Sequence, residues 1–177
     1  HEPPPTRLML LAVPLGMALA AGLGLLWSTI VTVRPPADPF SMTITLPGLL
    51  AAIAALLVFL LLHELLHALP QVLSGSSEPV VIGFWPRYMA PYVAYLGPLS
   101  REAQLVSGVM PLLVLTLLPF AVALVAPAMV PWMAGLSILN VLGSAADLVG
   151  LVLIVRQVPP RATLRNQGHA TWWRTAF

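Results

Sequence analysis

Four apolar stretches, each long enough to cross a bilayer, constrain this chain more than any other feature. A transmembrane helix needs about 20 mostly apolar residues to span a hydrocarbon core about 30 Å thick. The chain has such stretches at residues 8–33, 46–69, 103–126 and 131–155. Pro70 predicts the end of the second stretch, and Pro111 and Pro119 predict kinks in the third. The sequence therefore predicts an all-α polytopic membrane protein with about four transmembrane helices.

The composition agrees with a membrane location. Hydrophobic residues make up 59% of the chain and charged residues only 8%, whereas soluble domains contain about 25% charged residues. The net charge is only +2 in a very apolar chain, so we take the positive side chains as a sign of orientation in the bilayer and not of nucleic-acid binding. There are no cysteines, so any bound metal must use imidazole and oxygen ligands. We expect one integral membrane domain over residues 1–177.

The loop at residues 71–102 contains charges, prolines and all three tyrosines. Its segments VVIGFW and YVAYL are β-branched and aromatic runs separated by a proline-containing turn, which predicts a β-hairpin or a re-entrant loop. Such a hairpin either holds a substrate strand by edge pairing or merely caps the bundle, with aromatic anchors at the membrane interface. We take Trp85, Tyr92 and Arg101 as candidate substrate-binding residues, although Arg101 fits a plain positive-inside residue equally well.

The arginines predict how the chain is oriented. Four crossings put both termini and the 71–102 loop on one side, and that side carries every arginine except Arg34, which lies near Asp38. Because cytoplasmic segments favour arginine, we predict that both termini are cytoplasmic. The basic tail, residues 156–177, places Trp172 and Trp173 at the interface, and we expect part of it to be disordered.

The segment HELLH, residues 63–67, holds the only ionisable side chains of the second apolar stretch. Residues four apart lie on one face of a helix, so His63 and His67 can present their imidazoles to one ion, with Glu64 as general base beside a bound water. Ionisable residues inside spans are costly and usually mark function. The alternative is a pair of polar histidines near a helix end. The pattern favours a metal site, with zinc as the ion.

A catalytic zinc normally takes three protein ligands, so a third must come from elsewhere. Asp147 is the one acidic residue inside another predicted span. At 1.5 Å per residue, His63, His67 and Asp147 lie about 9, 3 and 12 Å from the same membrane surface. We therefore predict Asp147 as the third ligand, the alternative being a buried aspartate paired with an arginine or a backbone group. The reserve candidates are Glu78, Glu102 and His169.

A polar stripe on the fourth span supports this choice. Asn140, Ser144 and Asp147 recur at spacings of four and three, with Gly143 and Gly150 close by, so this face is expected to pack inward. The small residues fit ordinary close helix packing equally well. Asn140 is a candidate catalytic residue that donates to a developing oxyanion, or else it makes a hydrogen bond between packed helices.

These residues resemble two known groups of proteins. HELLH near the end of one span and Asp147 late in a following span are similar to the site-2 protease type of intramembrane zinc metalloprotease. Over about residues 46–155 the chain more closely resembles a family of small bacterial membrane proteins, the zincin peptidases of unknown function. In that family a motif like PLSR, here Pro98, Leu99, Ser100 and Arg101, follows the HExxH helix. Site-2 proteases end the segment of their third ligand in Asp-Gly, which NVLGSAADLVG lacks.

The resemblance implies a zinc metalloprotease of the bacterial plasma membrane. It would hydrolyse peptide bonds of transmembrane or membrane-proximal segments near the cytoplasmic face, with the lipid bilayer and a membrane-protein substrate as partners. A non-catalytic zinc-binding protein, either a sensor or a degenerate protease that binds helices, stays open as an alternative. A transporter is a third class, but four spans without a repeat give little architecture for alternating access. Glu64 favours hydrolysis, because zinc binding alone does not need it.

Overall fold

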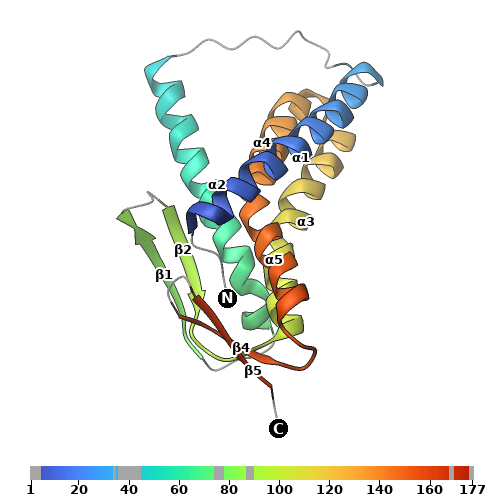
Figure 1. Cartoon of the computed structure of the whole chain (residues 1–177). Coiled ribbons are helices and arrows are strands. Elements are labelled where there is room, and N and C mark those ends of the chain that lie inside the picture. The colour runs from blue at the N-terminus through green and yellow to red at the C-terminus, as the bar shows by residue number, and fades with distance from the viewer. Residues whose placement is uncertain are drawn as a thin grey trace.

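A computed structural model describes residues 5–33, 35, 45–73, 78–86, 90–167 and 170–175 of the chain (Figure 1). The helices are α1 Pro5–Val33, α2 Leu46–Leu73, α3 Arg101–Val125, the 3-10 helix η2 Pro127–Met129, α4 Val130–Gly143 and α5 Ala145–Gln157. The strands are β1 Val80–Trp85, β2 Ala90–Tyr95, β3 Leu99–Ser100, β4 Thr163–Gln167 and β5 Ala170–Arg174. The described chain is therefore mostly helical, as predicted, with two small sheets.

Helices α1, α2 and α3 are each long and apolar enough to cross a membrane. Helices α4 and α5 pass the same test only together, and they are bent by 43° at the break between them. The fourth span predicted over about residues 131–155 therefore consists of two helices with a bend between them. The break falls at Ser144, between Gly143 and Ala145, and small residues of this kind permit a helix to kink. Ser144 is fully buried, so the bend lies inside the bundle.

The predicted end of the second helix at Leu69 is wrong. Helix α2 continues through Pro70 and ends at Leu73. A proline removes its own N–H bond and its ring crowds the preceding turn, so a helix continues past it only where tertiary contacts stabilise the further turn. Helix α3 supplies such a contact, because Ser107 Oγ donates a hydrogen bond to the carbonyl of His67.

The two halves of α2 have different surroundings. In Figure 1 the first half stands apart from α1, α3 and α4, and every residue of this half, 46–58, is exposed. The second half packs on α3 and on β2. Far from these contacts, Trp27 of α1 stacks on Phe120 of α3 with ring centroids 4.3 Å apart, and its Nε1 donates to Ser137 Oγ of α4. The bundle is thus held at both ends by α3.

Both sheets lie at the end of the bundle where α2 and α5 finish and α3 begins (Figure 1). Strands β1 and β2 form the predicted antiparallel hairpin, in a register that pairs Val80 with Tyr95 and Gly83 with Tyr92. Strands β3, β4 and β5 form a second antiparallel sheet. In the tail, where disorder of a part was expected, the described residues form β4 and β5, and Leu164 of β4 is fully buried with Val158 and Ala162.

Candidate metal centre

Two imidazoles from one face of α2 and a carboxylate from α5 converge at this end of the bundle. His63 Nε2 lies 3.3 Å and His67 Nε2 lies 3.5 Å from Asp147 Oδ2. The potential ligand atoms of all three residues lie within 4.8 Å of one another, in the one such group found among the described residues. Asp147 stands in the first turn of α5, directly after the bend at Ser144. The structure thus brings together the three residues predicted as ligands.

The orientation of His67 is fixed by the backbone of α3. Its Nδ1 lies 2.9 Å from the carbonyl oxygen of Ser107. A carbonyl oxygen only accepts hydrogen bonds, so Nδ1 must carry the proton. In the neutral ring this leaves the lone pair on Nε2, the atom that faces Asp147.

The orientation of His63 is fixed by Asn140 of α4. The amide nitrogen of Asn140 donates to the carbonyl of Pro111 at 3.0 Å and to Thr116 Oγ1 at 3.1 Å. This leaves Asn140 Oδ1 to accept from His63 Nδ1, at 3.0 Å. Both histidines therefore carry their proton on Nδ1 and point Nε2 toward Asp147. Metal-binding histidines are typically held in this way, by a hydrogen bond from the ring nitrogen that does not bind the metal.

The donor set fits a zinc ion. Two Nε2 lone pairs and a carboxylate oxygen face one another, and Asp147 Oδ2 is buried without a hydrogen-bond donor in the described part of the chain. Buried anionic groups without partners are costly, so a cation among these atoms would stabilise the arrangement. Two imidazole nitrogens and one carboxylate oxygen are ligands that zinc accepts in catalytic sites.

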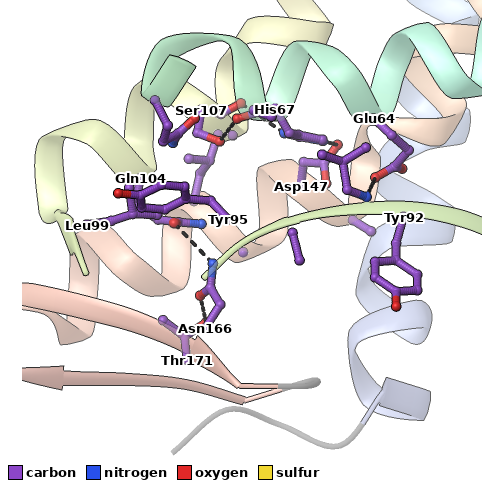
Figure 2. Close-up of a pocket in the computed structure, with 18 of the residues that line it drawn as sticks. Glu64, His67, Tyr92, Tyr95, Leu99, Gln104, Ser107, Asp147, Asn166 and Thr171 are labelled. Atoms are coloured by element: carbon purple, nitrogen blue, oxygen red, sulfur yellow. Dashed lines mark hydrogen bonds and ion pairs between the residues drawn. The ribbon is translucent and has the colours of Figure 1, made fainter. Parts of the chain in front are cut away.

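Glu64 lies beside the ligands and is not one of them. Its Oε2 accepts a long hydrogen bond, 3.4 Å, from the backbone N–H of Val93 in β2. Figure 2 shows Glu64, His67 and Asp147 close together, with β2 passing beside Glu64, and all three line a cavity. Its carboxylate is therefore placed where it can accept a proton next to a bound metal.

The position of Asn140 does not fit the predicted role as an oxyanion donor. Its side chain is 1% exposed, and its amide nitrogen already donates to Pro111 and Thr116. The other possibility raised by the sequence, a hydrogen bond between packed helices, agrees with these contacts. Asn140 thus links α3 and α4 to His63.

The cavity beside the cluster has a volume of about 830 Å³. Glu64, His67 and Asp147 line it, as do the predicted substrate-binding residues Trp85 and Tyr92. The two aromatic rings meet edge to face, with centroids 6.1 Å apart. A Cβ atom at Gly83 would collide with the Tyr92 ring, so the glycine lets this ring lie across β1. The hairpin therefore supplies an aromatic wall to the cavity.

Arg101 and the reserve ligands lie elsewhere. Arg101 is not among the residues that line the cavity, and its Nη2 donates to the carbonyl of Val155 near the end of α5, at 3.3 Å. This contact ties α3 to α5 and does not fit the predicted role in substrate binding. Glu78 and Glu102 are exposed and do not belong to the metal cluster. His169 lies outside the described residues.

Other residues contribute to the site without having been predicted to do so. Ser107 and Pro111 of α3 supply the carbonyls described above, and the only signal in the sequence was the proline, which frees a carbonyl of its helix. Gln104 of α3 accepts a hydrogen bond from Asn166 of β4, which in turn accepts one from Thr171 of β5 (Figure 2). All three line the cavity. No sequence pattern indicated that these three residues form a second polar end of the cavity.

These features define a class of protein: a helical membrane-type bundle that carries a candidate metal centre of two histidines and an aspartate. A family described as "Putative zincin peptidase" matches residues 56–163, and the chain belongs to this family. The matched region runs from Leu56, near the middle of α2, to the first residue of β4. Searches of the curated proteins and of the solved structures gave no match.

Proposed function

We propose that this protein is an intramembrane zinc metallopeptidase that hydrolyses peptide bonds of transmembrane or membrane-proximal segments. Membership of the family supports a metallopeptidase. The observation that carries the proposal is the convergence of His63 Nε2, His67 Nε2 and Asp147 Oδ2 beside Glu64, at the wall of a cavity. The ligands belong to α2 and to the bent pair α4–α5, which supports an intramembrane setting.

His63, His67 and Asp147 would hold the zinc, which supplies an acidified water molecule and polarises the scissile carbonyl. Glu64 would accept the proton of the attacking water and deliver it to the leaving amine as the C–N bond breaks. Asn140 and the Ser107 carbonyl would keep the two imidazoles in the required tautomer. The residues thus divide into ligands, a general base and groups that orient the ligands.

The outer edge of β2 supports binding of the substrate as an extended strand. In an antiparallel pair, alternate residues direct their N–H and C=O groups to opposite sides. Val93 directs its N–H away from β1 and toward Glu64, and Tyr95 shares that side by alternation. A locally unwound substrate segment would pair along this edge and place a carbonyl beside Glu64. Trp85 and Tyr92 would contact its side chains.

The setting that we propose is the plasma membrane of a bacterium, with both termini and the site near the cytoplasmic face. The distribution of arginines supports this orientation. Water must reach the site for hydrolysis, and the cluster lies in the last turns of α2 rather than at its centre. The partners would be the lipid bilayer and a membrane-protein substrate.

The test is cleavage of a panel of synthetic transmembrane peptides by the zinc-loaded protein in lipid nanodiscs, beside Glu64→Gln. We expect the wild type to cut, whereas Glu64→Gln keeps zinc and loses about 10²–10⁴-fold in rate. Equal rates for the two proteins would exclude the proposed role of Glu64. A zinc-loaded wild type that binds the peptides and cuts none would favour a non-catalytic zinc-binding protein instead.

A further inference from the structure

Helix α3 contains two buried prolines, Pro111 and Pro119, one at the level of the metal cluster and one two turns further on. In an α-helix the N–H of each residue bonds to the carbonyl four residues earlier. A proline has no N–H, so Pro111 leaves the carbonyl of Ser107 without its helical partner, and Pro119 does the same to Leu115. In an apolar span a freed carbonyl needs another donor.

The carbonyl freed by Pro111 is the one that binds His67. Ser107 O accepts from His67 Nδ1 at 2.9 Å, and this contact fixes the tautomer that leaves Nε2 facing Asp147. At position 111, any residue with an N–H would compete with His67 for the carbonyl oxygen of Ser107, because that N–H would form the helical hydrogen bond along the axis.

The carbonyl of Pro111 itself serves the other histidine. It accepts from the Asn140 amide nitrogen at 3.0 Å, and Asn140 Oδ1 in turn accepts from His63 Nδ1 at 3.0 Å. Pro111 is fully buried between these groups. One turn of α3 therefore reaches both imidazoles, one through the carbonyl that the proline frees and one through the carbonyl that it carries.

We propose that Pro111 is a positioning residue of the metal centre. Its missing N–H reserves the Ser107 carbonyl for His67, and this is the part of the role that only a proline can fill. Its backbone carbonyl, which any residue at this position would also carry, accepts from the Asn140 amide that orients His63. The inference rests on the proposed function, because it assigns Pro111 a role toward the zinc that His63, His67 and Asp147 would hold. Pro119 provides the matched comparison, since it lies in the same helix and is also buried, but the carbonyl that it frees contacts neither histidine.

The experiment compares zinc affinity of wild type, Pro111→Ala and Pro119→Ala by competition with a chromogenic chelator in detergent. Loss of a group that orients a metal ligand typically costs 10–100-fold in affinity. We expect a loss of that size in Pro111→Ala and a change of less than about threefold in Pro119→Ala. Equal affinity in Pro111→Ala and wild type would overturn the proposal, and so would equal losses in both variants, because a general effect of helix kinks would then suffice.

A second measurement uses the metal-free wild type and does not depend on a variant that folds. Imidazole ¹⁵N chemical shifts report which ring nitrogen carries the proton. We expect His67 to be protonated on Nδ1, and we expect this preference to weaken in Pro111→Ala and to persist in Pro119→Ala. A metal-free wild type with His67 protonated on Nε2 alone would overturn the proposal. A wild type that binds no zinc but has the Nδ1 tautomer would reject the proposed function and leave the positioning of His67 intact.

Discussion

The metal end of the cavity and its hairpin wall are built in different ways. At the metal end, the Nδ1 atom of each imidazole donates a hydrogen bond to a buried residue, which is Asn140 for His63 and Ser107 for His67. On the wall, the side chains are apolar or aromatic, and Phe84 and Tyr92 are 52% and 37% exposed. The chemistry needs fixed atoms, whereas recognition of an extended apolar segment needs accessible surface. The effects of substitutions at the metal end and in the hairpin wall should therefore differ in kind as well as in size.

The largest expected effect is at a ligand. His67→Ala should lose zinc and with it all measurable peptide hydrolysis, because two protein ligands hold a catalytic zinc weakly. Treatment of the wild type with a chelator should have the same effect, and added zinc should restore activity to the wild type only. Restored activity in His67→Ala would place the metal elsewhere.

The next effect is at a residue that orients a ligand. Asn140→Ala should lower zinc affinity by about 10–100-fold, because His63 loses its partner and the Pro111 carbonyl loses its donor. Thr116→Val is the matched control, since it removes only one acceptor of the same amide. Chelator competition measures both. Similar affinities in Asn140→Ala and wild type would mean that His63 does not need this contact.

Substitutions in the hairpin wall should change substrate binding alone. Tyr92→Ala and Trp85→Ala should raise KM by up to about tenfold, the factor that corresponds to about 1.4 kcal/mol. Zinc content and kcat should stay close to wild type, because neither residue belongs to the metal cluster. Steady-state kinetics on a cleaved transmembrane peptide separates the two parameters. A fall in kcat without a change in KM would show that the wall takes part in the chemistry.

The smallest effect on catalysis is expected at Arg101. Arg101→Ala should leave zinc affinity and peptide hydrolysis within about twofold of wild type, because the side chain bonds to Val155 and lies outside the cavity. The loss of that bond should lower the free energy of unfolding by about 0.5–1.5 kcal/mol. Denaturation in detergent measures this change. A large rise in KM would revive the predicted role in substrate binding.

The difference between the two ends also explains what the sequence could predict. His63, Glu64, His67 and Asp147 were identified because helical periodicity and the parity of membrane crossings place them without knowledge of side-chain contacts. Whether Asn140 donates to a substrate or to a neighbouring helix depends on which way its amide points, and only tertiary structure decides that. Arg101 was ambiguous for the same reason.

The folded tail and the helix ends show a second limit. The polar composition of residues 156–177 gave no signal for strands, but one apolar side chain, Leu164, is buried with Val158 and Ala162 and anchors β4. Pro70 taken by itself predicts the end of a helix, whereas in the structure contacts with α3 stabilise one further turn of α2. The bend at Ser144 depends on packing in the same way. In each case a local preference is overridden by contacts that are distant in sequence.

The most direct test of the central claim is the metal content of the purified protein, measured by elemental analysis beside Asp147→Ala and Glu102→Ala. The two variants each remove one carboxylate, but only Asp147 belongs to the cluster. We predict about one zinc per chain in the wild type and in Glu102→Ala, and clearly less in Asp147→Ala. A wild type that carries no metal and cannot be loaded with one, or an Asp147→Ala variant that keeps its zinc, would contradict the account.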